Sequence, residues 1–281
     1  KVDTAPVSAE ELAAVGAGTQ QVATPGSTAP LLPVAPANPL AAGAAAQSGA
    51  PVQVIPSKFA LVIGNGDNRL PDGMIPFAVD DAKRVRDALV NFSGYDPRNV
   101  DVVSNATAAG MREAAEKLAA RAPEGSVIFF YFTGMGAVLD GKDYLAVVDT
   151  ESATDRNSMV AKTDIYRPFV GKGCRLFTFF QVPRTIVKND YFGHEIPPLG
   201  SLSQMQSTLP GDGISYAILD GKPVGIFTQA LTSVMEDQRS NRIPIGEFGW
   251  QVFYKVRRGN SGTTGGAGRQ TPTLPLLRFL P

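Results

Sequence analysis

The sequence predicts an α/β domain in which helices flank a mainly parallel sheet, preceded by an extended arm rich in Pro and Ala. Two observations predict this fold class. Beyond Lys58, continuous apolar runs alternate with segments whose apolar residues recur at helical spacing, which is typical of strand–helix units around a parallel sheet. Residues 1–56 contain no aromatic residue, are rich in Ala, Pro, Gly, Ser, Thr and Val, and have almost no charge beyond the first dozen positions. The predicted boundaries are therefore 1–56 for a low-complexity arm or linker and 57–281 for the domain.

The first half of the domain is expected to hold three buried strands and two helices. An apolar run that ends at Gly, as in KFALVIGN (58–65), is typical of a buried parallel strand. An apolar stripe from Ala78 to Leu89 recurs at helical spacing and indicates a helix with one buried face. Thr107 is expected to cap the next helix. The predicted elements are strands at 58–65, 99–104 and 126–132 and helices at 77–91 and 108–121.

The second half is expected to begin with a β-hairpin that turns at Asp140-Gly141. Pro275 restricts a last strand, 271–279, to a sheet edge. Trp250, Phe253 and Tyr254 are expected in the core, with a partner-binding face as the alternative. The predicted elements are the hairpin at 136–149, a helix near 160–170, a fourth core strand at 174–180, a loop at 183–211, a fifth strand at 214–220, helices at 224–237 and 247–258, and a mobile loop at 259–270.

Composition excludes several classes of function. The 26 basic and 26 acidic residues leave a formal net charge of zero, so the chain has no general attraction for nucleic acid. No window approaches the length of about 18 apolar residues that a membrane span requires. One cysteine, Cys174, and one histidine, His194, are too few for an internal disulfide, a thiol-rich metal site or a zinc enzyme. We therefore predict no cofactor and no metal site.

The order of these segments resembles the caspase/metacaspase superfamily of cysteine peptidases, above all its bacterial members. The resemblance implies a caspase-like three-layer sandwich over about 58–275, with a mainly parallel central sheet flanked by helices. Single stretches are weak signals, and their order and spacing make the set specific. The similar stretches are KFALVIGN (58–65), VDDAKRVRDAL (79–89), GYDPRNVDVVSNAT (94–107), FFYFTGMG (129–136), DGKDYLAVVD (140–149), FTFFQVPR (177–184), GIFTQALTSVM (225–235) and RQTP (269–272).

The same resemblance implies where that family places its catalytic residues. Its histidine position is Met135, held between Gly134 and Gly136, and its cysteine position is Pro183. Methionine has no proton to transfer, and proline offers neither a nucleophile nor the backbone N–H of an oxyanion hole. The acidic residue that helps many metacaspases accept a basic substrate side chain is replaced by Gln181. The resemblance therefore implies a catalytically inactive pseudo-caspase, in which Gly134, Met135, Gly136, Gln181, Pro183 and Arg184 line a relic cleft that could still bind a peptide.

An active hydrolase with displaced catalytic residues is the alternative from another class. Cys174 lies at the start of its predicted strand, whereas active sites in open α/β sheets lie beyond the carboxyl ends of the strands. His194 lies in a Pro-flanked loop, and Thr133 and Thr185 have no visible base beside them. We expect none of these four residues to be catalytic.

Two ligand-binding alternatives are also weak. Asp67, Asp72, Asp80 and Asp81 could bind Ca²⁺, but their spacing is not that of an EF-hand. Asp80 and Asp81 are better explained as acids near a helix start. IGNGDN (63–68) lacks both common phosphate-loop patterns, so we expect an ordinary backbone turn.

The leading hypothesis is a non-catalytic caspase-like domain that binds protein or serves as a structural component of a larger assembly. Other protein subunits are the expected partners, contacted by the arm 1–56, and the assembly could be a homo- or hetero-oligomer. A regulatory pseudo-protease that pairs with an active homologue through the edge at 271–279 is a further alternative. The Ala/Pro-rich spacer and a start at Lys1 rather than Met are compatible with export to the periplasm of a bacterium, and equally with a shortened sequence.

Overall fold

Six strands form the central sheet in the described part of the chain, which is seen here as a computed structural model. The structure describes residues 56–71, 73–186, 202–239, 241–259, 265–266, 270–273 and 276–277, all within the compact unit Gln53–Pro281. The predicted arm, apart from Pro56, and the candidates Asp72 and His194 lie outside the described residues.

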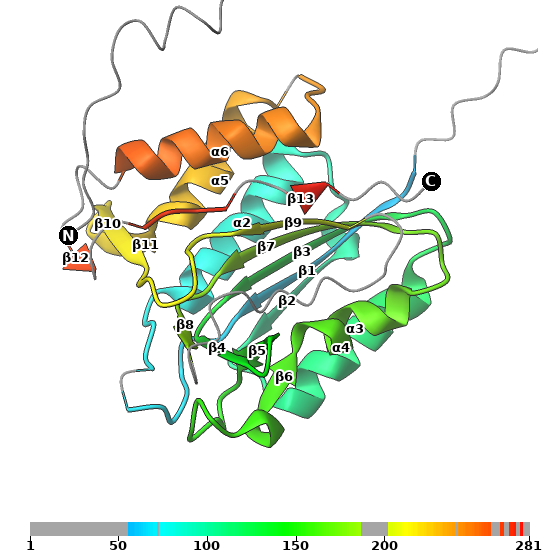
Figure 1. Cartoon of the computed structure of the whole chain (residues 1–281). Helices are drawn as coiled ribbons and strands as arrows, with labels where there is room; N and C mark the ends of the chain where they lie inside the picture. Colours follow the sequence, from blue (N-terminus) through cyan, green and yellow to red (C-terminus); the bar gives the residue numbers. More distant parts are fainter. Residues whose placement is uncertain are drawn as a thin grey trace, which may run out of the picture. The chain divides into compact units, whose positions relative to one another are not determined.

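The sheet has the order β13-β9-β7-β3-β1-β2. Five strands run parallel, and β13 pairs antiparallel with β9 at one edge. The fold is therefore the predicted α/β class with a mainly parallel sheet (Figure 1). The strands are β1 Lys58–Gly64, β2 Val100–Ser104, β3 Val127–Thr133, β7 Arg175–Gln181, β9 Leu202–Gln206 and β13 Leu276–Leu277.

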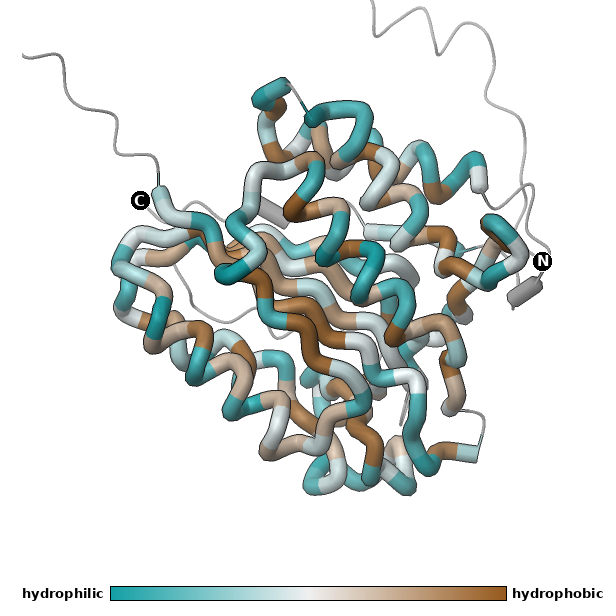
Figure 2. Tube along the Cα trace, turned by 180° about the vertical axis from the view of Figure 1, so that it is seen from behind, coloured by the Kyte–Doolittle hydropathy of each residue, from teal (hydrophilic) through white to brown (hydrophobic). Residues whose placement is uncertain are grey.

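Helices cover both faces of this sheet (Figure 1). The side chains of α2, α5 and α6 pack on one face in a cluster that includes Val62, Phe129 and Tyr131. The side chains of α3 and α4 pack on the other face with Leu61 and Phe130. Figure 2 shows the strands as a largely hydrophobic layer between helices that alternate hydrophobic and hydrophilic residues. The helices are α2 Ala78–Phe92, α3 Ala108–Arg121, α4 Lys162–Tyr166, α5 Ile226–Asp237 and α6 Ile245–Gly259, with 3-10 turns at Pro97–Asn99, Arg156–Ser158 and Arg167–Phe169.

Two smaller sheets complete the described part of the chain. One has the order β6-β5-β4-β8, and the other is antiparallel with the order β11-β10-β12. The predicted hairpin turn is confirmed, because Asp140 and Gly141 both have positive φ, at 48° and 76°. The strands are β4 Gly136–Leu139, β5 Lys142–Ala146, β6 Met159–Ala161, β8 Arg184–Ile186, β10 Ser215–Leu219, β11 Lys222–Gly225 and β12 Gly265–Gly266.

The strand predicted at 214–220 is present, but it does not belong to the central sheet. Residues 214–220 form β10, which pairs with β11 outside the central sheet, and the fifth parallel strand is β9, inside the stretch predicted as a loop. The sequence of β9, LSQMQ, is mostly polar, and its polar side chains are buried. Tyr166 Oη donates to Gln204 Oε1 at 3.2 Å. Hydropathy cannot identify such a strand.

The aromatic residues of α6 were also predicted wrongly. Trp250 and Tyr254 are 46% and 60% exposed and stack on each other, while Phe253 is half-buried. The buried face of α6 is instead formed by Gly249, Val252 and Val256. In the part of the chain that the structure describes, no helix combines the length and apolar character needed to cross a membrane.

Candidate functional site

The carboxyl ends of β3 and β7 bring the two predicted site segments together. The strands are parallel neighbours, with Thr133 opposite Gln181. Beyond the strands, Gly134 N donates to Gln181 O at 3.3 Å and Gly136 N donates to Pro183 O at 3.2 Å. The chain then continues into β4 and β8, which also pair in parallel. The positions of Met135 and Pro183 therefore lie on adjacent segments at one end of the sheet, where an open α/β fold places its active site.

Met135 and Pro183 are both only partly buried. Met135 packs against Ile75 and Phe77, a small apolar cluster that precedes α2. Its sulfur cannot accept or release a proton at physiological pH, and Pro183 has no backbone N–H. The two positions can therefore make apolar contacts, but they supply no group for acid–base or nucleophilic chemistry.

The backbone donors near Pro183 already have partners. Gly134 N and Gly136 N are bonded across to the β7–β8 segment, and Val182 N donates to Ser207 Oγ at 3.3 Å. An oxyanion hole needs donors that point at the position of the developing charge. These three N–H groups point instead at acceptors of the protein itself.

The glycine on the β4 side of Met135 is required by packing. A Cβ atom on Gly136 would lie 2.7 Å from Tyr144 O and 2.7 Å from Val182 Cγ1, closer than side chains tolerate. The close approach of β4 to β5 and β8 thus explains this glycine without any catalytic role.

Gln181 is fully buried and its amide is used internally. Nε2 donates to Asp81 Oδ2 at 2.7 Å and to Thr133 Oγ1 at 3.0 Å. Oε1 accepts from Thr228 N at 2.9 Å. Gln181 therefore joins the end of β7 to the first turns of α2 and α5, and its side chain cannot line an open cleft as the sequence predicted.

Asp81 is the centre of this first polar network. Besides Gln181, it accepts from Gly225 N at 3.1 Å and from Thr228 Oγ1 at 2.8 Å. Burial raises its pKa to about 7, although these hydrogen bonds and the more distant Arg84 oppose the shift. No cation forms an ion pair with Asp81 among the described residues. The carboxyl group is consequently half-protonated near neutral pH.

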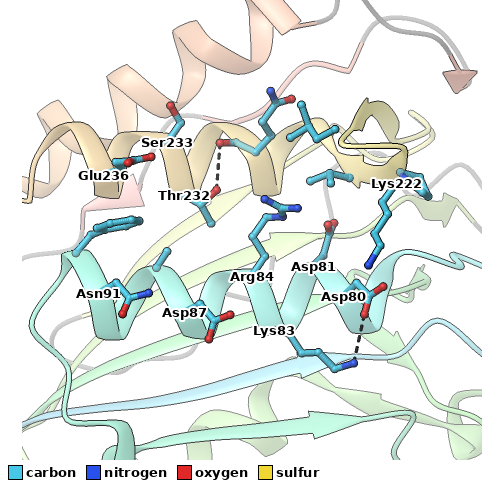
Figure 3. A pocket seen from close by; sticks show the side chains of 16 residues that line it. Asp80, Asp81, Lys83, Arg84, Asp87, Asn91, Lys222, Thr232, Ser233 and Glu236 are labelled. Atoms are coloured by element: carbon cyan, nitrogen blue, oxygen red, sulfur yellow. Dashed lines mark hydrogen bonds and ion pairs between the residues drawn. The ribbon is translucent and has the colours of Figure 1, made fainter.

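A cavity of about 640 Å³ lies beside this network, between α2, α5 and the β10–β11 hairpin. Figure 3 shows Asp81 and Arg84 projecting from α2 toward α5. The lining carries both charge signs, and Lys83 pairs with Asp80 at 3.3 Å. A mixed lining of this kind indicates no ligand class by itself.

Arg184 belongs to a second buried network. Its guanidinium is completely buried, with Nη1 at 3.2 Å from Asp143 Oδ1 and Nη2 donating to Thr208 O at 2.7 Å. Asp143 also pairs with Lys162 Nζ at 2.7 Å and accepts from Gln206 Nε2 at 3.2 Å. Like Gln181, Arg184 is thus unavailable to an open cleft, contrary to the sequence-based expectation.

The charges of this second network set two pKa values. Burial alone would raise the pKa of Asp143, but Lys162 and Arg184 outweigh burial and hold that pKa below its usual value. Burial and the nearby Arg184 lower the pKa of Lys162 to about 8, although Asp143 opposes the shift. With all three groups ionised, two cations share one carboxylate, and Lys162 Nζ also lies 4.1 Å from the centre of the Phe180 ring.

The residues considered as displaced catalytic groups either lie far from the junction of β3 and β7 or have no base beside them. Cys174 is buried just before β7, at the opposite end of that strand from Pro183, and burial raises the pKa of its thiol. A strand of seven residues spans roughly 20 Å, so the thiol is far from the junction. Thr133 is buried and accepts from Gln181, and Thr185 is exposed on β8.

The calcium and phosphate alternatives find no geometric support. In the described residues no three His, Cys, Asp or Glu side chains gather in a way that could hold a metal ion. In the IGNGDN turn, Gly66 N and Asp67 N both donate to Asn105 Oδ1, at 2.9 and 3.3 Å. The N–H groups that a phosphate would need therefore already have an acceptor.

Comparison with known proteins identifies the family of this chain. A sequence profile described as the caspase domain matches residues 57–276. The chain belongs to the caspase-domain family. No curated protein matches the chain. Caspase domains are normally proteolytic, and the local signature of their nucleophile is Q-A-C-[RQG]-G. That signature is absent from this chain.

Solved caspase structures share the fold. A structure titled pro-sf-caspase-1 is 14% identical, with a TM-score of 0.57, covering 80% of this chain and 91% of that one. Caspase-1 from Spodoptera frugiperda is 14% identical, with a TM-score of 0.54 and coverage of 80% and 86%. A protein from Geobacter sulfurreducens is 14% identical, with a TM-score of 0.52 and coverage of 80% and 95%.

Sequence reasoning missed the two buried carboxylates. A signal for Asp81 was present, because it falls on the same helical stripe as Ala78, Ala82 and Val85, all of which are buried. An acid within an apolar stripe indicates a buried polar contact. For Asp143, Lys162 and Arg184 no local pattern exists, because three separate strand and helix ends meet only in the folded chain.

Proposed function

We propose that this caspase domain is non-catalytic and acts as a protein-binding or structural component of a larger assembly. The observation that carries the proposal is that Met135 and Pro183, the positions to which the resemblance assigns the catalytic histidine and cysteine, lie on adjacent strand ends. Neither residue can form or break a covalent bond to a substrate. What the two positions retain is a partly exposed apolar surface.

The polar residues around the junction support the same proposal. Gln181 and Arg184 are buried in hydrogen-bonded networks, and each network ties β7 or β8 to other elements. Side chains committed in this way stabilise the fold and do not reach a substrate. The caspase scaffold is thus retained, while its chemically active positions are used for packing.

A binding surface lies beside Met135. A groove of about 370 Å³ is lined only by apolar residues and tyrosine, and Met74 and Ile218 on its rim are 67% and 48% exposed. Met135 packs against the same Ile75 and Phe77 that form the groove wall. Exposed apolar patches of this kind mark interaction sites in many proteins.

The absence of catalysis is tested directly with the purified protein. We expect no cleavage of denatured protein substrates and no labelling by cysteine- or serine-directed covalent probes, with an active caspase as the positive control. The readout is mass spectrometry of peptide products and of labelled side chains. A peptide product that disappears when one named residue of this chain is substituted would overturn the proposal.

The binding surface is tested by proteins that co-purify with the chain from its own source. We expect Met74→Glu together with Ile218→Glu to remove specific partners, measured by quantitative mass spectrometry. Val170→Glu is the matched control, because Val170 is 54% exposed and lies outside the groove. Identical sets of partners for the groove variant and the control would contradict binding through this surface.

A second candidate is a regulatory pseudo-protease that pairs with an active homologue. The observation that favours it is β13, the edge strand of the central sheet in the described part of the chain. An edge strand can extend its sheet into a partner. Mass photometry of the chain mixed with an active caspase-domain homologue distinguishes this candidate, because a mixed dimer supports it and two unmixed species exclude it.

A further inference from the structure

A cavity of about 830 Å³ opens at the amino end of the central sheet, the end opposite Met135 and Pro183. Its mouth includes Lys58, Val127 and Arg175, the first residues of β1, β3 and β7. These three residues are in register across the sheet, so their side chains lie on the same face. The cavity lies on the face that α2, α5 and α6 cover, and none of the site residues discussed above contributes to it.

The interior of this cavity is largely apolar and aromatic. Phe129, Phe177 and Phe179 from β3 and β7 form its floor, and Phe248 of α6 packs edge-on against Phe179 with ring centres 6.0 Å apart. The rest of the wall comes from the ends of α2 and α5 and from the start of α6, through Leu89, Tyr95, Met235, Ile243 and Ile245. The size and lining match those of cavities that hold small molecules, which span roughly 300–1,000 Å³.

Among the described residues, the charged side chains that line the cavity are all cations. They are Lys58, Arg175 and Arg242, and no described Asp or Glu lines it. Lys58 Nζ donates to Ser93 O at 2.8 Å, and neither Arg175 nor Arg242 has an ion pair among the described residues. The positive charge of Arg242 adds to burial in lowering the pKa of Lys58. Three cations that converge on an apolar cavity without a counter-charge are complementary to an anion.

An adjoining cavity of about 510 Å³ extends the same feature. It shares Lys58, Met235, Arg242 and Phe248 with the first and adds Arg239, again with no acidic side chain among the described residues that line it. Arg239 differs from the other cations, because Glu236 pairs with it at 3.0 Å. The uncompensated charge is therefore concentrated at Lys58, Arg175 and Arg242, next to the aromatic floor.

We propose that this cavity binds a single-chain amphipathic molecule with an anionic head group, with the acyl chain over the phenylalanine floor and the head group between Arg175 and Arg242. An apolar chain is stabilised by removal from water in proportion to its buried area. A charge-assisted hydrogen bond from a guanidinium fixes the position of the head group. A molecule with an acyl chain of equal length but a neutral head group would gain only the stabilisation from burial of its chain.

Isothermal titration calorimetry with three probes of equal chain length tests the proposal: decanoate, decyl phosphate and 1-decanol. We expect one molecule of an anionic probe to bind per chain, and 1-decanol to bind at least tenfold more weakly. The two anionic probes distinguish a carboxylate head group from a phosphate. Octanoate should bind more weakly than decanoate, because the shorter chain buries less apolar surface.

Two variants that each remove one positive charge locate the site. Arg242→Gln and Arg175→Gln are each expected to weaken binding of the anionic probe by about tenfold, the loss typical of one hydrogen bond to a charged group. Binding of 1-decanol should be unchanged in both. Arg69→Gln is the control, because Arg69 forms an exposed pair with Glu151 at the other end of the sheet. Equal affinity for 1-decanol and decanoate, or equal losses in Arg69→Gln and Arg242→Gln, would overturn the proposal.

Discussion

Asp81 and Asp143 are both almost completely buried near the carboxyl end of the sheet, yet their surroundings differ in charge. Asp81 is surrounded by neutral donors, the side chains of Gln181 and Thr228 and the backbone of Gly225, and its pKa is raised to about 7. Asp143 lies between Lys162 and Arg184, and its pKa is lowered. Burial acts on both in the same direction, so the presence of cations decides the sign of the shift.

The comparison shows two ways in which this caspase domain stabilises a buried carboxyl group near the carboxyl end of its sheet. One network holds a carboxyl group that can be neutral and needs only hydrogen bonds. The other holds an ionised carboxylate that needs its cations. The Asp81 network should tolerate loss of the carboxylate charge, whereas the Asp143 network should not. Each of the following experiments tests this difference.

The largest loss in the free energy of unfolding is expected for Asp143→Asn. The substitution leaves Lys162 and Arg184 buried without a counter-charge, and breaking a buried pair in this way typically costs about 3–5 kcal/mol in the free energy of unfolding. Urea denaturation measures the change. Lys162→Met is the matched control, because it leaves one carboxylate with one guanidinium, and we expect it to cost about 1 kcal/mol or less. Equal losses in the two variants would show that charge balance is not what holds this network together.

The next effect is a dependence of stability on pH caused by Asp81. Its pKa is about 7 in the folded chain, against about 3.9 in an unfolded one. The folded state therefore binds more protons between these values. The contribution to the free energy of unfolding is fully present below about pH 4 and is lost as the pH rises through about 7.

Comparison with Asp81→Asn isolates this contribution. Between pH 5 and pH 8 the wild-type free energy of unfolding should fall by roughly 2–3 kcal/mol relative to that of the variant. Asp143 contributes little in this window, because a carboxylate with a lowered pKa is ionised in both states above pH 5. Parallel pH profiles for the wild type and Asp81→Asn would mean that Asp81 is ionised throughout.

The smallest loss of stability is expected for Gly225→Ala. A Cβ atom at this position would lie 2.2 Å from Gln181 Oε1 and 2.3 Å from Nε2, so the amide must move away from Asp81 and Thr228. Overpacking of this kind typically costs about 1–3 kcal/mol. In Gly110→Ala the new Cβ would meet nothing closer than Thr107 Oγ1 at 3.4 Å, and the helix should be stabilised by about 0.5–1 kcal/mol. Thermal unfolding distinguishes the two, and a neutral Gly225→Ala would show that Gln181 is not fixed by this close approach.

Apolar strands and amphipathic helices could be predicted from the sequence, whereas a buried polar strand could not. The strands β1, β3 and β7 and the helices α2 and α3 were predicted from their hydrophobic patterns, and Thr107 caps α3 by accepting from Gly110 N. β9 could not be predicted, because Gln204 and Gln206 are buried through partners from distant parts of the chain. The exposed Trp250 and Tyr254 were misplaced for the opposite reason, since an apolar side chain need not be buried.

The sequence alone determined the α/β class, the resemblance to caspases and the identity of Met135 and Pro183, because local periodicity and side-chain chemistry are properties of neighbouring residues. The tertiary structure decided what surrounds them. It buried Gln181 and Arg184 in separate networks, gave Asp81 and Asp143 opposite pKa shifts, and placed Lys58, Arg175 and Arg242 around one apolar cavity. Each of these outcomes depends on burial and on hydrogen-bond or ion-pair partners that lie at least 19 residues away along the chain, which no local pattern encodes.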